Sequence, residues 1–279
     1  MRLLLGNSSI LVGLGLLVGC SDTPPPIKEA AKVGGETEAP KLAVLAPRQR
    51  PERSDPIAAA IIEAAIKAHT GGKPEALQAF KSLKVSREGQ GVVMTAEPVL
   101  QKWQLQMVWP DRIRYRLEMP QQQIGTLVRA GDIAWASGSG APGKQIMPIE
   151  QTAAFNLDTS WEWLWLLFPL TEPTTVFATD ADAAPNSKPA SGVRVWAKGI
   201  TDAVLYFDKE TKLLSQITFD GREGIQKVTK EVVVYGTKAF SGATLPEKMV
   251  LRSNGKYLCE WTVTGFEPTV IDSKVFENP

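Results

Sequence analysis

Two neighbouring stretches of alternating polar and apolar residues restrict the possible folds of this chain more than any other feature. Residues 102–109 read KWQLQMVW, and residues 112–119 read RIRYRLEM. Because successive side chains of a strand point to opposite faces, each stretch predicts a β-strand with one buried face. Pro110 and Asp111 lie between the stretches and suit a turn. The sequence therefore predicts a β-hairpin whose apolar face carries Trp103, Leu105, Met107, Trp109, Ile113, Tyr115, Leu117 and Met119.

Shorter strand-like runs follow, separated by turn sequences such as AGD, DKETK and DGREG. They are centred near Leu127, Trp135, Val195, Leu205, Ile217, Val233, Val250 and Trp261. A helix precedes all the strands, because Asp55 is a suitable N-cap, Pro56 suits a first helical turn and Gly71 suits a helix end. A second, short helix is expected from Pro74. We therefore expect residues 55–279 to form one α+β domain built on a long antiparallel meander.

One segment that interrupts the strands is apolar on every side. Residues 158–170 read DTSWEWLWLLFPL, in which Glu162 is the only charged residue after the polar start. The side chains of Asp158 to Ser160 are suitable caps for a helix that begins there. A helix that is apolar all round is buried or covers something apolar, and this one is too short to span a bilayer. We therefore expect a hydrophobic helix at residues 161–170.

The first 19 residues have the form of a signal peptide. Arg2 precedes a short, glycine-containing apolar run that ends at Gly19. The sequence Leu17-Val18-Gly19-Cys20 resembles the lipobox of bacterial lipoproteins, in which the cysteine thiol is linked to diacylglycerol and the cysteine becomes the mature N-terminus. The resemblance predicts a lipid anchor at Cys20, and the alternative is an uncleaved membrane anchor. Ser21 favours sorting to the outer membrane, whereas Asp22 keeps the inner membrane open as an alternative.

The segment after the predicted anchor has the composition of a linker. It is rich in proline and charge and has no aromatic residue, so it buries little apolar surface and is predicted to be disordered. With Cys20 acylated, Cys259 has no partner for a disulfide, and it alternates with apolar residues, so we expect it in the core. The predicted organisation is a lipoprotein signal peptide at 1–19, a lipidated linker at 20–54 and a folded domain at 55–279.

The remaining candidate sites are weak. Residues 138–144 match the P-loop pattern G-x-x-x-x-G-K, but Gln145 replaces the required Ser or Thr and Pro148 follows where a helix should begin. His69, the only histidine, lies at the end of the first predicted helix, where a partly positive imidazole suits the helix dipole. Residues 180–182 lack the repeated carboxylates of a calcium loop. We expect no catalytic residue, metal or cofactor.

The charges point to no nucleic-acid partner. Lysine and arginine total 31, against 30 for aspartate and glutamate, so no strong field of one sign is expected. Arg112, Arg114 and Arg116 share the polar face of the predicted hairpin. They either contact lipid headgroups or an acidic partner, or form a solvated outer face on which their stems shield the sheet. We favour the solvated face.

The order of these parts resembles the outer-membrane lipoprotein-sorting proteins, the LolA/LolB-type unclosed β-barrels. The similarity covers residues 57–279 and rests on the order of an opening helix, VWPDRIRY, RAGDIAW, the hydrophobic helix, LYFDKETKLLSQITF and IDSKVFENP. It implies a strongly curved antiparallel sheet, an unclosed half-barrel, whose concave face holds acyl chains under a helical lid. The hydrophobic segment at 161–170 falls at the place of the lid helix.

The resemblance also implies a ligand site. The candidates for the cavity wall and the lid are Trp103, Leu105, Met107, Trp109, Trp161, Trp163, Leu164, Trp165, Leu167 and Phe168. Carriers of this family place an arginine immediately before the hairpin proline, where it helps to hold the lid. This chain has Trp109 there, so that way of holding the lid is not expected here.

Two functions fit this sequence, and both are non-enzymatic because no nucleophile, base and orienting group come together. In the first, a lipid-anchored monomer on the outer membrane, facing the periplasm, binds acyl chains or a lipoprotein in the half-barrel and serves lipoprotein sorting. In the second, the same shell has a filled core and is a structural or interaction module of the envelope. A cavity of several hundred Å³, lined by tryptophan, leucine and methionine, favours the binding protein.

Overall fold

The computed structural model describes residues 49–92, 98–120, 123–139, 141–223 and 226–277. This part of the chain contains one antiparallel sheet of thirteen strands, in the order β6-β5-β4-β3-β2-β1-β13-β12-β11-β10-β9-β8-β7. The bounds are β1 Ser82–Val92, β2 Pro98–Val108, β3 Arg112–Met119, β4 Gln123–Ala130, β5 Ile133–Gly138, β6 Ala141–Ile146, β7 Val176–Ala183, β8 Ala190–Ala197, β9 Ile200–Asp208, β10 Leu214–Glu223, β11 Gln226–Phe240, β12 Ala243–Ser253 and β13 Lys256–Pro268. The predicted signal peptide, the anchor at Cys20 and most of the linker lie outside the described residues.

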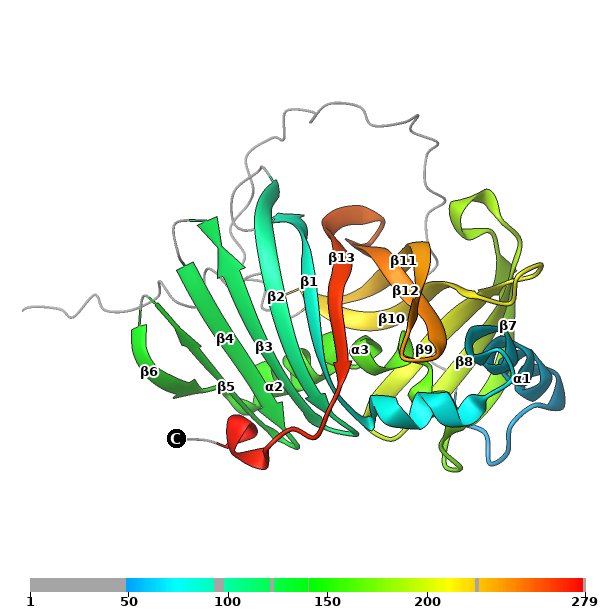
Figure 1. Ribbon diagram of the computed structural model, residues 1–279, viewed down its shortest axis with the longest axis horizontal. Helices are drawn as coiled ribbons and strands as arrows, with labels where there is room; N and C mark the ends of the chain where they lie inside the picture. Colours follow the sequence, from blue (N-terminus) through cyan, green and yellow to red (C-terminus); the bar gives the residue numbers. More distant parts are fainter. Residues whose placement is uncertain (1–48, 93–97, 121–122, 140, 224–225, 278–279) are drawn as a thin grey trace, which may run out of the picture.

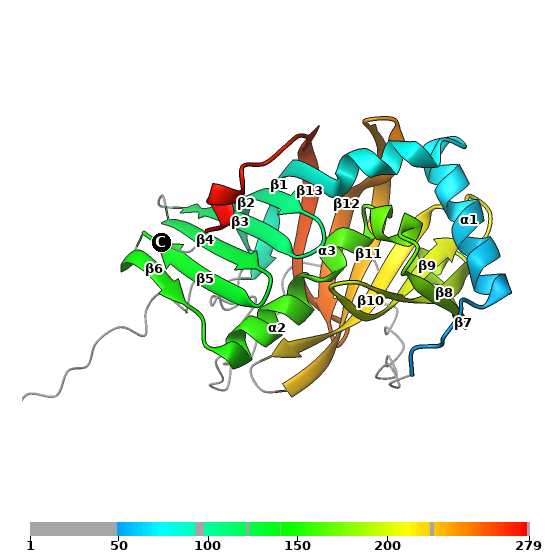
Figure 2. The same ribbon diagram turned by 90° about the horizontal axis from the view of Figure 1, so that it is seen from below.

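The sheet is strongly curved and does not close, since β6 and β7 form its two edges in the described chain (Figures 1 and 2). Between these edges the chain forms the helices α2 Ile149–Thr159, α3 Trp161–Leu164 and η3 Phe168–Thr171. Helix α2 contacts β5 on one half of the sheet and β10 on the other, so this segment crosses the open side of the half-barrel. The α+β fold class and the unclosed half-barrel are confirmed. Residues 149–171 are called the lid segment below.

Helix α1 (Pro56–Thr70) and helix η1 (Pro74–Lys81) lie where the sequence predicts them. The Asp55 carboxylate accepts a hydrogen bond from the Ile57 amide at 2.8 Å, and Gly71 ends α1 in a left-handed conformation with φ 60°. Ala58, Ile62 and Ala65 are buried, and α1 contacts β7, β8 and β12. The short helices η4 (Pro185–Ser187) and η5 (Ser273–Phe276) complete the described elements.

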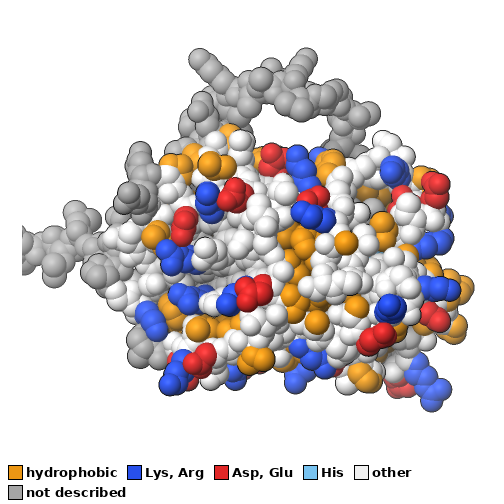
Figure 3. Space-filling view, viewed as in Figure 1, with side chains coloured by type: hydrophobic (Ala, Val, Ile, Leu, Met, Phe, Trp, Pro, Cys, Tyr) orange, Lys and Arg blue, Asp and Glu red, His pale blue; other side chains and the backbone are white. Residues whose placement is uncertain are grey.

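The predicted hairpin is formed by β2 and β3, which pair from Val108 with Arg112 to Lys102 with Glu118. The apolar side chains Leu105, Met107 and Ile113 are buried, whereas on the polar face Arg112 is exposed and Arg114 and Arg116 are half-buried. Arg114 donates to Gln106 at 3.2 Å, and Arg116 lies 3.2 Å from Glu118. Positive and negative side chains are interspersed over this side of the molecule (Figure 3).

The prediction for the interrupting helix is wrong in its bounds. Asp158 and Thr159, expected to cap a new helix, are instead the end of α2. Ser160 is the N-cap of α3 as expected, but it is also the C-cap of α2 and its side chain caps no amide of α3, which has only four residues. Helix α2 was not predicted from the sequence, because its buried face carries Thr152 and Ala154 beside Phe155 and so shows no helical repeat of large apolar residues. The apolar residues that follow are packed from all sides, as the composition indicates: residues 161–170 are all buried.

His69 is buried and neutral, which contradicts the expectation of a partly positive imidazole at the end of α1. Its Nδ1 donates to the Thr244 carbonyl oxygen, and its Nε2 accepts a hydrogen bond from the Leu214 amide at 2.9 Å. Burial lowers the pKa of His69 to about 4, against the opposing effect of the Thr244 carbonyl. The imidazole is therefore neutral at pH 7 and ties α1 to β10 and β12.

Candidate functional site

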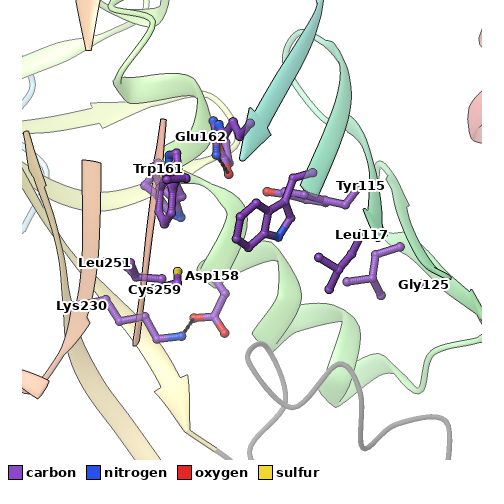
Figure 4. Close-up of a pocket in the computed structure, with 13 residues that line it drawn as sticks. Tyr115, Leu117, Gly125, Asp158, Trp161, Glu162, Lys230, Leu251 and Cys259 are labelled. Atoms are coloured by element: carbon purple, nitrogen blue, oxygen red, sulfur yellow. Dashed lines mark hydrogen bonds and ion pairs between the residues drawn. The ribbon is translucent and has the colours of Figure 1, made fainter. Parts of the chain in front are cut away.

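A cavity of about 100 Å³ lies between the lid segment and the concave face of the sheet (Figure 4). Its apolar wall is formed by Trp103, Leu117, Leu127, Trp161, Leu251 and Trp261. Its polar wall is formed by Arg87, Tyr115, Asp158, Glu162 and Lys230, and Gly125 and Cys259 complete the lining. The volume exceeds the roughly 10–15 Å³ that one water needs, but it is below the roughly 300–1,000 Å³ of typical ligand pockets.

Three tryptophans from three different elements meet at this cavity. The Trp261 ring on β13 lies 5.5 Å from the Trp161 ring on α3 and 6.3 Å from the Trp103 ring on β2, measured between ring centroids. Trp161 also stacks on Phe219 of β10 at 6.3 Å. The curvature of the sheet brings these strands together around the lid, which supplies a large apolar surface at one place.

A buried ion pair joins the lid segment to β1. Arg87 donates from Nη1 and Nη2 to the two carboxylate oxygens of Glu162, at 2.9 and 2.5 Å, and the two side chains are only 4% and 3% exposed. Trp165 Nε1 donates to the same carboxylate at 3.2 Å. The guanidinium carbon also lies 5.2–5.5 Å from the ring centroids of Trp161, Trp165 and Trp261, where the ring faces attract a cation.

A second buried ion pair joins the lid segment to β11. Lys230 Nζ lies 2.8 Å from Asp158 Oδ1, and the two side chains are 3% and 0% exposed (Figure 4). The Arg222 amide donates to the same oxygen at 3.2 Å. Burial raises the pKa of Asp158, and the Lys230 charge opposes that shift. The pair fits closely, because a methyl group at Gly221 would come within 2.6 Å of Asp158 Oδ1.

The two ion pairs lie on either side of the junction between α2 and α3 and hold the lid segment against two different strands, β1 and β11. Trp109, the residue before the hairpin proline, packs on Trp163 at 5.3 Å and on Phe168 at 5.6 Å, measured between ring centroids. The charged contact between the hairpin side of the sheet and the lid segment comes from Arg87 on β1, the strand that pairs with β2 of the hairpin. Arg87 was not among the predicted site residues; the one signal for it in the sequence is a charged residue in phase with the apolar residues Leu83 and Val85 of β1.

The predicted ligand-site residues divide into two groups in the structure. Trp103 and Trp161 line the cavity. Trp109 is partly buried against the main hydrophobic core, and the buried members of that core include Leu105, Met107, Trp163, Leu164, Trp165, Leu167 and Phe168. The structure therefore brings two of the ten residues to the cavity and places the other eight in or against the main core, and the part of all ten in ligand binding stays a prediction.

The other candidate residues have structural partners. Asp180 pairs with Arg194 at 2.7 Å, and Asp182 pairs with Lys209, so neither carboxylate is arranged as a calcium ligand. Within the described ranges, no three His, Cys, Asp or Glu side chains form a group that suits a metal ion. Burial raises the pKa of the Cys259 thiol, which makes it a poor nucleophile. The P-loop-like sequence joins the adjacent strands β5 and β6.

Among the described residues, no helix is both long and apolar enough to cross a bilayer. The predicted lipid anchor at Cys20 remains a prediction.

An unclosed antiparallel half-barrel with a lid segment across its open side, over an apolar cavity, defines a LolA-like fold. A LolA superfamily protein from Nitrosomonas europaea has the same fold, with a TM-score of 0.53 and 9% identity over 79% of this chain and 97% of that chain. A DUF1329 family protein from Desulfovibrio piger matches with a TM-score of 0.51 and 8% identity over 80% of this chain and 98% of that chain. At such identities the likeness shows the fold alone.

Sequence comparison adds no assignment to a family. No family profile matches the chain. No curated protein matches it either. The fold predicted from the order of short motifs is thus confirmed by structure, at a sequence identity of about one residue in ten.

Proposed function

We propose that this chain is a non-enzymatic, lipid-anchored protein of the bacterial envelope that binds acyl chains, free or carried by a lipoprotein, in its half-barrel. The single observation that carries the proposal is the apolar cavity under the lid segment, walled by Trp103, Trp161 and Trp261. The LolA-like fold supports it, because a half-barrel with a lid offers a concave apolar surface that hydrocarbon can fill.

The anchor and the location belong to the same proposal. Cys20 carries the lipid, and residues 20–54 tether the half-barrel to the membrane. We place the protein on the outer membrane, facing the periplasm, with the inner membrane as the alternative that Asp22 leaves open. It acts as a monomer without a cofactor, and a role in lipoprotein sorting follows if its ligand is the acylated end of a lipoprotein.

A whole acyl chain enters only when the lid segment moves. The cavity of about 100 Å³ holds a small part of a chain, and the side chains above it are packed. The ion pairs Arg87–Glu162 and Lys230–Asp158 hold the lid segment closed in this state. Ligand binding then depends on the population of an open state, in which the lid tryptophans contact ligand instead of each other.

The small cavity also favours the second function, a structural or interaction module with a filled core. Its volume is below the several hundred Å³ that we expect of a binding protein, and residues 161–170 are buried throughout. In that case the ion pairs are permanent parts of the core, the lid segment does not open, and no hydrophobic ligand binds.

Equilibrium dialysis of the full-length protein against radiolabelled dodecanol distinguishes the two functions. The ligand is a twelve-carbon chain with a small uncharged head, so it tests the chain site alone. We expect saturable binding that weakens in Leu251→Trp, because Leu251 lines the cavity and the larger ring fills it. The matched control Leu100→Trp lies at a position that is 56% exposed and should bind as the wild type does. No saturable binding by the wild type supports the filled module.

A further inference from the structure

The cavity lining has more hydrogen-bond donors than its neighbours use. Arg87 Nε and Trp261 Nε1 are buried and have no hydrogen-bond partner. Lys230 is buried as well, and in the described part of the chain its ammonium donates to Asp158. An ammonium group has three protons, so two of them remain available. The unused acceptor among these charged side chains is Asp158 Oδ2.

A cavity for hydrocarbon alone gives no reason for this surplus of donors. A buried donor without a partner destabilises the folded state, by about 1–3 kcal/mol as a general rule. An acyl chain has no acceptor to offer, whereas a carboxylate or phosphate has several lone pairs and forms its strongest hydrogen bonds with charged donors. The lining therefore combines an apolar wall with donors that suit an oxyanion.

We propose that the cavity receives the oxyanion head of a single-chain amphiphile, a carboxylate or a phosphate, at Lys230 and Arg87. This inference rests on the proposed function, because the chain of the same molecule lies along the tryptophan wall. The small volume of the cavity favours one chain over several.

Lys230 is the side chain that the head reaches by exchange with the lid segment. The Glu162 carboxylate accepts two hydrogen bonds from Arg87 and a third from Trp165, whereas Asp158 accepts one from Lys230 and one from the Arg222 amide, both at Oδ1. The weaker pair exchanges more readily. The oxyanion takes the place of the Asp158 carboxylate at Lys230, the net charge around Lys230 is preserved, and the end of α2 is released from β11.

Four ligands with the same twelve-carbon chain test the proposal in the full-length protein. Laurate and dodecyl phosphate carry oxyanions, dodecanol is neutral and dodecyltrimethylammonium is a cation, each used below its micelle concentration. Equilibrium dialysis should show at least about tenfold tighter binding of an oxyanion than of dodecanol or the cation, the effect of one charge-assisted contact. Laurate alone identifies a carboxylate head, dodecyl phosphate alone identifies a phosphate head, and both results support the proposal.

The double variant Lys230→Met/Asp158→Asn removes the pair and nearly keeps its shape, and the side-chain amide oxygen that replaces the carboxylate still accepts from the Arg222 amide. The affinity ratio of laurate to dodecanol should fall to about one, and this ratio is unaffected by any general loosening of the lid. The matched control Lys227→Met/Asp220→Asn removes an ion pair at 2.7 Å between β11 and β10, outside the cavity lining, and should keep the wild-type ratio.

The failures of the two proposals are distinguishable. Equal binding of all four ligands by the wild type overturns the oxyanion site and leaves the acyl-chain function standing. Binding of none of them overturns both. If the double variant does not fold, the order of the four ligand affinities in the wild type still tests the oxyanion site. Lys230→Arg, which keeps the charge, should then retain the preference for oxyanions. An unchanged ratio in a folded double variant also contradicts the proposal.

Discussion

The substitution Glu162→Gln should lower stability and raise ligand affinity at the same time. Glu162 is 3% exposed and accepts hydrogen bonds from Arg87 at 2.9 and 2.5 Å and from Trp165 at 3.2 Å. Removal of one partner from a buried ion pair costs about 3–5 kcal/mol. The three tryptophan rings near the guanidinium partly compensate the uncovered charge. We therefore expect the lower end, about 3 kcal/mol of unfolding free energy.

The effect on affinity follows from the position of this pair between lid and sheet. Glu162 lies on the lid segment, so its loss destabilises the closed state, whereas the open state has no such pair to lose. If the open state alone binds acyl chains, its population rises by up to about 100-fold for about 3 kcal/mol. Dodecanol affinity should increase toward that limit. A neutral ligand is chosen because the uncovered Arg87 would attract an anionic one.

Urea denaturation followed by tryptophan fluorescence gives the stability, and equilibrium dialysis with dodecanol gives the affinity. Asp220→Asn is the matched control, because its partner Lys227 is 51% exposed and the pair is expected to contribute less than about 1 kcal/mol. A loss of stability with unchanged or weaker dodecanol binding refutes the gating role of the lid. A loss below about 1 kcal/mol shows that water reaches the pair and refutes its burial.

Three further predictions concern other parts of the chain. His69 has a pKa of about 4 in the folded state against an ordinary value of 6.5. The folding stability that the neutral imidazole contributes is therefore fully present above pH 6.5 and is lost as the pH falls. Between pH 7.5 and 5 the wild type should lose about 2 kcal/mol more unfolding free energy than His69→Gln, measured by urea titration; equal losses contradict this. Gly221→Ala should lower the melting temperature, at a cost of about 1–3 kcal/mol, because the new methyl meets Lys230 at 2.6 Å. Gly236→Ala, whose nearest contact is 3.8 Å away, is the control. Labelled palmitate should enter the wild type and not Cys20→Ser, and equal labelling would exclude the anchor.

The fold could be predicted well where the buried face carries apolar residues. The alternation in residues 102–119 gives the hairpin directly, and Asp55 and Gly71 give the limits of α1. Strand β1 was not among the strands located from the sequence, because Arg87 takes an inward position and breaks the apolar period. Helix α2 was missed because small and polar side chains share its buried face.

The site could be predicted less completely than the fold, and the reason is the separation of its charged partners. Arg87 and Glu162 are 75 positions apart, and Asp158 and Lys230 are 72 apart. A charged residue in a sequence indicates a solvated side chain unless its partner is known, so neither pair was visible before folding placed them together. The tryptophans were visible individually, but the curvature of the sheet decides which of them reach the cavity.

Native mass spectrometry of the protein extracted from its own membranes shows whether the half-barrel holds a bound lipid. If the half-barrel binds acyl chains, the full-length protein should carry a noncovalent lipid that is lost on activation in the gas phase and is distinct from the covalent anchor. Leu251→Trp should carry less of it than the control Leu100→Trp. A protein that carries only its covalent anchor, in the wild type and in both variants, contradicts the account and supports a module with a filled core.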